Sequence, residues 1–165
     1  MNLREIAALL EYDTWATNRT LGAVSSVPTS RYLEDLGSSH GGIHTTLLHI
    51  YSSDMIWYRR WTGAPAAAHL GRSEIPDLSS LGARWSTFQI DLHGFLDGLD
   101  DAKLVAQLSY RDLKGNPHSE PLFEQMLHLV NHSSYHRGQV VTMMRQVGVP
   151  PTGTDLIAFY RSRSI

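Results

Sequence analysis

The residues of this chain with the clearest chemical potential are two histidines, His132 and His136, one helical turn apart. They lie in LFEQMLHLVNHSSYHRGQVVTMMRQV, residues 122–147, which is predicted to form one long helix. Leu129 and Val140 fall on the same stripe, because these positions recur at spacings of three and four. Imidazoles at i and i+4 lie roughly 6 Å apart along the helix axis. Both can therefore bind one divalent cation, and the apolar stripe predicts that they point inward.

Two histidines alone make a weak site, so a third ligand is expected from another element. The chain has nine histidines. His49 is the best candidate, because it lies in the middle of a predicted helix at the margin of its apolar stripe. His40 and His44 form a second pair at the same spacing, but they flank two glycines at a helix start, and we expect them to be solvated. His128 lies on a polar stripe, which places it at the rim of the site.

The alternative for His132 and His136 is structural, as buried neutral imidazoles hydrogen-bonded to the backbone or to polar neighbours. Residue types alone weigh the two interpretations about evenly. A site with three histidines would leave a position for water or substrate, as catalytic zinc sites do. Imidazole suits Zn, Ni, Cu and Fe alike, so ligand type does not identify the metal.

Four predicted helices must position these residues. The apolar periodicity favours helices over about 3–24, 39–61, 77–99 and 122–147. Residues 62–76 are rich in glycine, proline and alanine and form a loop or crossover, residues 105–110 and 118–122 favour a small hairpin, and residues 154–160 favour a short helical turn. Four amphipathic helices with one long middle connection pack most economically as an all-α four-helix bundle, whose core is where metal sites are built.

Composition limits the function. A chain of 165 residues is expected to form a single domain over residues 1–165. Its formal net charge of -2 gives no basic stripe for a nucleic acid, and no apolar run approaches the roughly 18 residues of a membrane span. We expect a cytoplasmic protein, because the N-terminal stretch lacks the features of a signal peptide. The chain has no cysteine, so any sulfur chemistry must use the thiol of a partner molecule.

Three stretches resemble the DinB/YfiT-like superfamily: LLHIYSSDMIWYRRW at residues 47–61, MLHLVNHSSYHRGQVVTMMRQVG at residues 126–148, and the ending VPPTGTDLIAFY. The resemblance spans essentially the whole chain. It implies a four-helix bundle in up-up-down-down order, a homodimer, and one divalent metal ion per chain (Zn, Ni or Fe) held by three histidines. Carried over position by position, the ligands are His49, His132 and His136, and all three match.

The same motif contains Arg137 and Gln139, for which we favour a structural role, tying the helix to neighbouring loops, over contact with substrate. Asn131 and Tyr135 either orient the imidazoles from behind or face solvent.

The enzymes of this superfamily include transferases that use low-molecular-weight thiols and a thiol-dependent maleylpyruvate isomerase. The first hypothesis is therefore a metal-dependent thiol S-transferase acting on small electrophiles. The second is a metal-dependent hydrolase, which would want a general base, but no carboxylate adjoins His132 or His136. The third is a non-catalytic, metal-binding stress-response protein. An open coordination position reached by a pocket distinguishes an enzyme from a structural clip.

Overall fold

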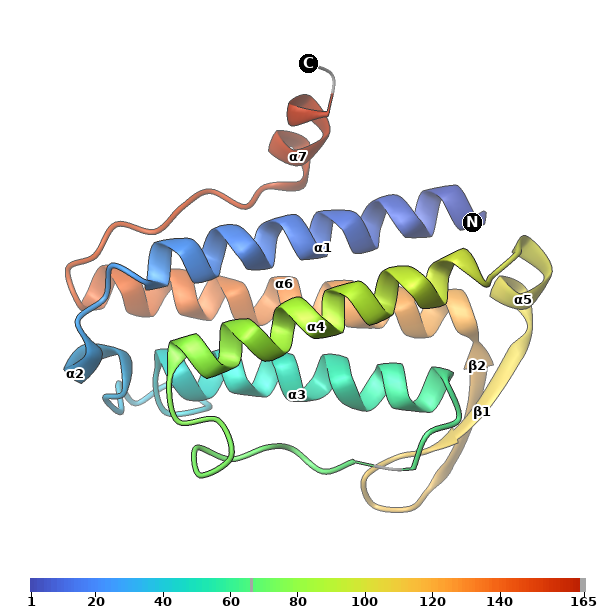
Figure 1. Cartoon of the computed structure of the whole chain (residues 1–165), viewed down its shortest axis with the longest axis horizontal. Helices are drawn as coiled ribbons and strands as arrows, with labels where there is room; N and C mark the ends of the chain where they lie inside the picture. The colour runs from blue at the N-terminus through green and yellow to red at the C-terminus, as the bar shows by residue number, and fades with distance from the viewer. Residues whose placement is uncertain (66, 164–165) are drawn as a thin grey trace.

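Four long helices form the bundle in the computed structural model, which describes residues 1–65 and 67–163 (Figure 1). The long helices are α1 (Leu3–Val24), α3 (Ile43–Trp61), α4 (Leu78–Asp97) and α6 (Leu122–Gln146). The shorter elements are α2 (Thr29–Tyr32), α5 (Asp101–Val105), α7 (Leu156–Ser162) and an antiparallel hairpin of β1 (Gln107–Arg111) and β2 (Pro117–Pro121). The predicted helical bundle with a small hairpin is confirmed. None of the helices in the described ranges is both long and apolar enough to cross a lipid bilayer.

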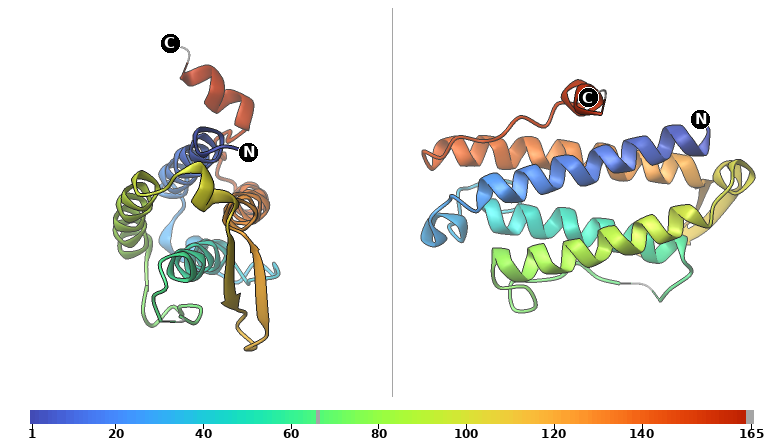
Figure 2. Two further views of the ribbon diagram at one scale, coloured as in Figure 1. Left: turned by 90° about the vertical axis from the view of Figure 1, so that its right-hand side faces the viewer. Right: turned by 45° about the horizontal axis from the view of Figure 1, so that its top comes forward.

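The order of helix directions differs from the expected up-up-down-down order. In Figure 1, α1 and α6 run from right to left, whereas α3 and α4 both run from left to right. The order is therefore up-down-down-up. The long connection between α3 and α4 allows this, because it runs back beside α3 before α4 begins (Figure 1). End-on, the four helices surround a common core, with α7 outside it and the hairpin projecting from one side (Figure 2).

A tight turn delays the start of α3 to Ile43, whereas the sequence predicted a helix from residue 39. Ser38 and Gly41 form an isolated bridge. Gly42 then passes so close to another segment that a Cβ atom there would lie 1.9 Å from the carbonyl oxygen of Glu34. Only glycine fits at this position without a shift of the backbone. The turn holds His40 immediately before the first residues of α3.

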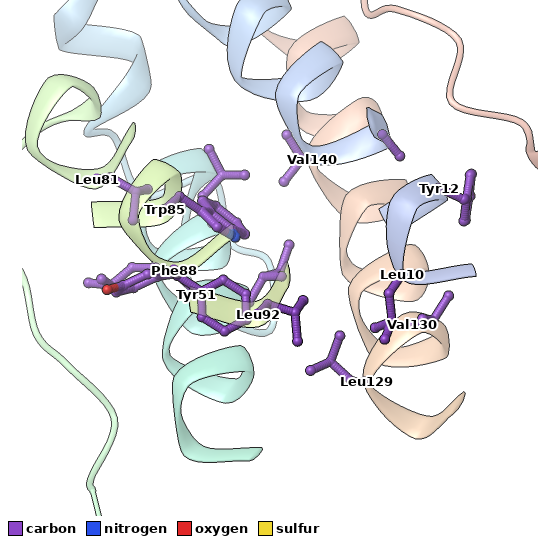
Figure 3. Packing of buried hydrophobic residues seen from close by; sticks show 14 of the residues in the cluster. Leu10, Tyr12, Tyr51, Leu81, Trp85, Phe88, Leu92, Leu129, Val130 and Val140 are labelled. Carbon is purple, nitrogen blue, oxygen red and sulfur yellow. The ribbon is translucent and has the colours of Figure 1, made fainter. Parts of the chain in front are cut away.

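The apolar core lies between the four long helices. Trp85 and Phe88 of α4 pack towards Leu129 of α6 and Leu10 of α1, all of them buried (Figure 3). Helix α6 packs more extensively against α3 and α1 than against any other element. Burying one apolar side chain of this size stabilises the fold by roughly 2 kcal/mol.

A charged cluster interrupts this core. The guanidinium of Arg137 on α6 donates through Nη1 to the carboxylate of Asp13 and to Thr17 Oγ1 at 3.2 Å, both on α1. Asp54 of α3 is fully buried and accepts a hydrogen bond from Ser133 Oγ at 3.2 Å. Its second oxygen, Oδ2, has no hydrogen-bond partner among the described residues. The structural role expected for Arg137 is found, but its partners lie on a neighbouring helix and not on loops.

Of the two carboxyls in this cluster, Asp54 has the environment that more strongly favours the protonated form. Burial, together with the negative charge of Asp13, raises the pKa of Asp54 well above its usual value, although Arg137 and Ser133 oppose the shift. Burial raises the pKa of Asp13 too, but Asp13 accepts directly from the guanidinium of Arg137, which opposes that shift and favours a charged Asp13 over a charged Asp54.

We therefore predict that Asp54→Asn is tolerated and changes how stability depends on pH. A raised folded-state pKa means that the folded protein binds a proton which the unfolded chain releases above about pH 4. That contribution to stability is present below pH 4 and is lost as pH rises through the folded-state pKa. The introduced amide mimics the protonated carboxyl of Asp54, so the variant should gain stability relative to the parent as pH rises from 4 to 8, measured by urea unfolding.

The matched control is Asp13→Asn, which removes the direct partner of a buried guanidinium. This variant should lose about 3–5 kcal/mol. Equal losses for the two variants at pH 8 would show that Asp54 is charged and paired.

Candidate metal centre

Four imidazoles converge where α3 faces α6. His49 projects from α3, His132 and His136 from α6, and His40 from the turn that precedes α3. Nε2 of His49 lies 3.0 Å from Nε2 of His132. The ring centroid of His136 lies 4.6 Å from that of His49 and 4.5 Å from that of His132. The three histidines predicted as ligands are thus adjacent in space.

The tilts of the rings separate His40 from the other three histidines. The ring planes of His49, His132 and His136 are inclined to one another by 56° to 77°. His40 instead stacks on His49, with centroids 3.8 Å apart and planes only 17° apart. A nitrogen lone pair lies in its ring plane, so inclined rings can direct their lone pairs at one point, whereas two stacked rings direct theirs in parallel.

His40 nevertheless belongs to the neighbourhood of the site. The ligand-capable nitrogens of His40, His49 and His136 lie within 4.8 Å of one another. The geometry therefore offers two sets of three histidines, which share His49 and His136. The ring angles favour His132 as the third member, and the grouping of nitrogen atoms favours His40. We give more weight to the ring angles, because rotation of His40 would be needed before its lone pair could meet that of His49.

The expectation that His40 and His44 are solvated is wrong. His44 is 1% exposed, and its Nδ1 lies 2.7 Å from the hydroxyl of Tyr32. His40 is half-buried against His49. The prediction failed because it placed both residues on one exposed helix start, whereas the turn before α3 folds His40 over the site. His128 is exposed, as expected for a residue at the rim.

Gln139 orients His136, a role that the sequence did not reveal. Its Oε1 lies 2.8 Å from Nδ1 of His136, and its Nε2 donates to Ser39 Oγ at 3.2 Å. An amide oxygen only accepts, so Nδ1 carries the proton and Nε2 keeps a free lone pair. Gln139 thus ties the helix to a loop, as expected, and also selects the tautomer that suits a ligand. Asn131 and Tyr135 are exposed.

Low pKa values favour the neutral form of His49 and His132, in which a ring nitrogen can donate its lone pair to a metal ion. Burial and, after it, the neighbouring histidines, His40 first, lower the pKa of His49 to about 3. Burial likewise lowers the pKa of His132 to about 4, with help from His136 and His128. Neutral imidazoles present the nitrogen donors that a divalent ion binds. The group of four histidines contains no carboxylate whose negative charge would stabilise a protonated ring. The residues present therefore fit a metal ion.

A cavity of about 440 Å³ opens beside the histidines. His40 and His49 form one wall, and His69 and Arg72, from the connection between α3 and α4, form part of the other. The ring of His69 lies 5.0 Å from that of His49, nearly parallel to it. Sequence reasoning missed His69 because it lies in a connection without periodicity. The centre thus has an accessible side through which a small molecule could approach.

The lowered pKa values predict acid sensitivity of the protein after treatment with a chelator. The unfolded chain protonates its histidines near pH 6.5, whereas folded His132 stays neutral down to about pH 4. The unfolded state therefore binds more protons in this window, and stability should fall as pH falls from 6.5 towards 4.

In the His132→Gln variant this dependence should weaken by up to about one proton, as measured by denaturant unfolding at several pH values. His93→Gln, at an exposed histidine of α4, is the control and should keep the parental slope. A parental slope in His132→Gln as well would contradict the assignment.

Comparison with known proteins agrees with the fold. The sequence profile of the DinB family matches residues 1–164. Protein DinB of Bacillus subtilis (strain 168) is 27% identical over 161 residues, which cover 89% of this chain and 88% of that protein. A crystal structure of a DinB-like protein from Bacillus cereus ATCC 10987 superposes with a TM-score of 0.59 at 20% identity, covering 88% of this chain and 94% of that one. The chain belongs to the DinB family.

Proposed function

We propose that His49, His132 and His136 hold one divalent metal ion and that the protein uses it to transfer a low-molecular-weight thiol to small electrophiles. The observation that carries this proposal is the close approach of His49, His132 and His136, of which His49 also lines an open cavity. A divalent ion at such a centre favours the thiolate form of a thiol that binds to it. The chain has no cysteine, so the reacting sulfur must come from a second molecule.

The spacing of the donors supports the metal. Two nitrogens each about 2.0–2.1 Å from one ion lie roughly 2.9 Å apart at a right angle and roughly 3.3 Å apart at a tetrahedral angle. The 3.0 Å between Nε2 of His49 and Nε2 of His132 falls within this range. Donor type is compatible with Zn, Ni or Fe.

The cavity lining favours thiol transfer over hydrolysis. Hydrolysis at a metal centre commonly relies on a carboxylate as general base. Among the described residues that line the cavity there is no aspartate or glutamate. Arg72 instead adds a positive charge, which would attract an anionic thiol or electrophile. His69 stands where it can accept the proton that a thiol loses on binding.

Ligand variants test the metal centre. His49→Ala, His132→Ala and His136→Ala should each abolish stoichiometric metal, measured by elemental analysis of purified protein. His40→Ala should keep about one ion per chain, because the stacked ring of His40 does not direct its lone pair at the same point as His49. Retention of metal by His132→Ala together with its loss from His40→Ala would assign the site to the alternative set of three histidines.

Thiol binding tests the open position. Protein loaded with Co²⁺ should develop a sulfur-to-metal charge-transfer absorption when a small thiol such as 2-mercaptoethanol is added. His136→Ala, which removes a shared member of both histidine sets, is the control and should develop no such band. Stoichiometric metal without any thiol band in the parent protein would favour hydrolysis or a structural clip.

A further inference from the structure

An arginine that contacts two neighbouring aromatic rings lines a second cleft, at the C-terminal end of α3. The guanidinium carbon of Arg60, in the last turn of α3, lies 4.4 Å from the ring centroid of Trp57 and 4.6 Å from that of Tyr110 on β1. Within the described residues Arg60 forms no ion pair. Contact with the two rings positions the guanidinium without using its N–H groups, which stay available to bind an anion.

The cleft beside Arg60 measures about 640 Å³ and lies between the end of α3, the following connection and the hairpin. Arg59 and Arg111 also line it, but each donates to a backbone carbonyl oxygen, Arg59 to Pro65 and Arg111 to Gly115. The only carboxylate in its described lining, from Asp112, accepts hydrogen bonds from the backbone and side chain of Asn116. The cleft is therefore positively charged, and Arg60 is the cation in its described lining without a fixed partner.

Arg60 lies on the same face of α3 as His49. Positions 49, 56 and 60 are spaced by seven and four residues, so they form one stripe, and Ile56 lines the cleft. Eleven residues of helix place the Cα atoms of Arg60 and His49 roughly 16 Å apart along the axis. The cleft is thus about three helical turns from the histidine centre.

Continuous contacts join the two places. On the α6 side, rings follow one another from His132 to His128 at 6.0 Å, from His128 to Trp57 at 5.1 Å, and from Trp57 to Tyr110 at 5.0 Å. On the other side, the connection from α3 to α4 runs beside α3 (Figure 1) and borders both spaces: Ala68 lines the cleft and the next residue, His69, lines the histidine cavity.

We propose that the Arg60 cleft binds a carboxylate of the same molecule whose sulfur or electrophilic carbon reaches the histidine centre. The substrate class is then an elongated molecule with its carboxylate roughly 16 Å from the reacting atom. The planar fork of one guanidinium matches the two oxygens of a carboxylate. For the reacting end of the molecule, this inference rests on the proposed function. The charge of the cleft and its distance from the histidine centre determine the other end, a carboxylate, and the length of the molecule.

Matched thiols test the proposal on Co²⁺-loaded protein, with the charge-transfer band as the measure of binding. The probes are an ω-mercapto oligo(ethylene glycol) carboxylic acid about 16 Å long, its methyl ester, 3-mercaptopropionate and the methyl ester of 3-mercaptopropionate. The long acid should bind roughly tenfold more tightly than its ester, because it gains a charged, two-point hydrogen bond. The short acid and its ester should bind about equally.

Arg60→Gln should remove the preference for the long acid, whereas Arg145→Gln, in the last turn of α6, should keep it. Equal affinity of the long acid and its ester in the parent protein would overturn the proposal. A preference for the long acid that Arg60→Gln does not change would also overturn it. An equal preference for the short acid over its ester would do the same, because the carboxylate would then bind beside the histidines.

A second measurement keeps the cleft testable if no thiol produces a band, which would count against the proposed function alone. In metal-free protein, glutarate should shift the indole N–H resonance of Trp57, assigned with Trp57→Phe, whereas dimethyl glutarate should not. Arg60→Gln should abolish the shift. No shift in the parent protein at millimolar glutarate would overturn the Arg60 proposal.

Discussion

The rotation of α6 about its own axis is the constraint on which the centre depends, and the buried contact of Arg137 with Asp13 sets it. Arg137 follows His136 directly, and successive residues of a helix point about 100° apart. Fixing Arg137 against α1 therefore turns the face that carries His136 towards α3. Ser133, next to His132, adds a second restraint through its bond to Asp54 of α3.

These two polar contacts select one rotation of α6, whereas apolar packing alone would allow several. Methionine and leucine side chains along α6 can pack at several helix rotations with similar free energy. A rotation that separates the buried guanidinium from its carboxylate would instead strongly destabilise the folded protein. The surrounding apolar core supplies most of the stabilisation, and the charged cluster selects one arrangement. The raised pKa of Asp54 favours its neutral form, which avoids a second buried negative charge beside a single cation.

The sequence predicted the parts of the centre that depend on helical periodicity. His132 and His136 share a stripe, and His49 lies at the margin of another, so their approach follows from packing two helices together. His40 and His69 were missed, because a turn and an irregular connection position them. The helix order expected from the resemblance was wrong, and periodicity could not correct it because it carries no information on helix direction. The contact of Arg60 with Tyr110 joins a helix end to a hairpin, a long-range contact that no local pattern encodes.

The electrostatics of the histidine cavity and of the Arg60 cleft favour anionic ligands in both. The chain has a formal net charge of -2, yet the described lining of the histidine cavity and the Arg60 cleft contains one carboxylate, that of Asp112, which is engaged within its own hairpin loop. Neutral imidazoles add no negative charge to offset a bound divalent ion, so the centre would be net positive, and Arg72 and Arg60 extend that potential along α3. Two positively charged spaces in a protein whose net charge is near zero concentrate negatively charged ligands. A thiolate at one end and a carboxylate at the other match this distribution of charge.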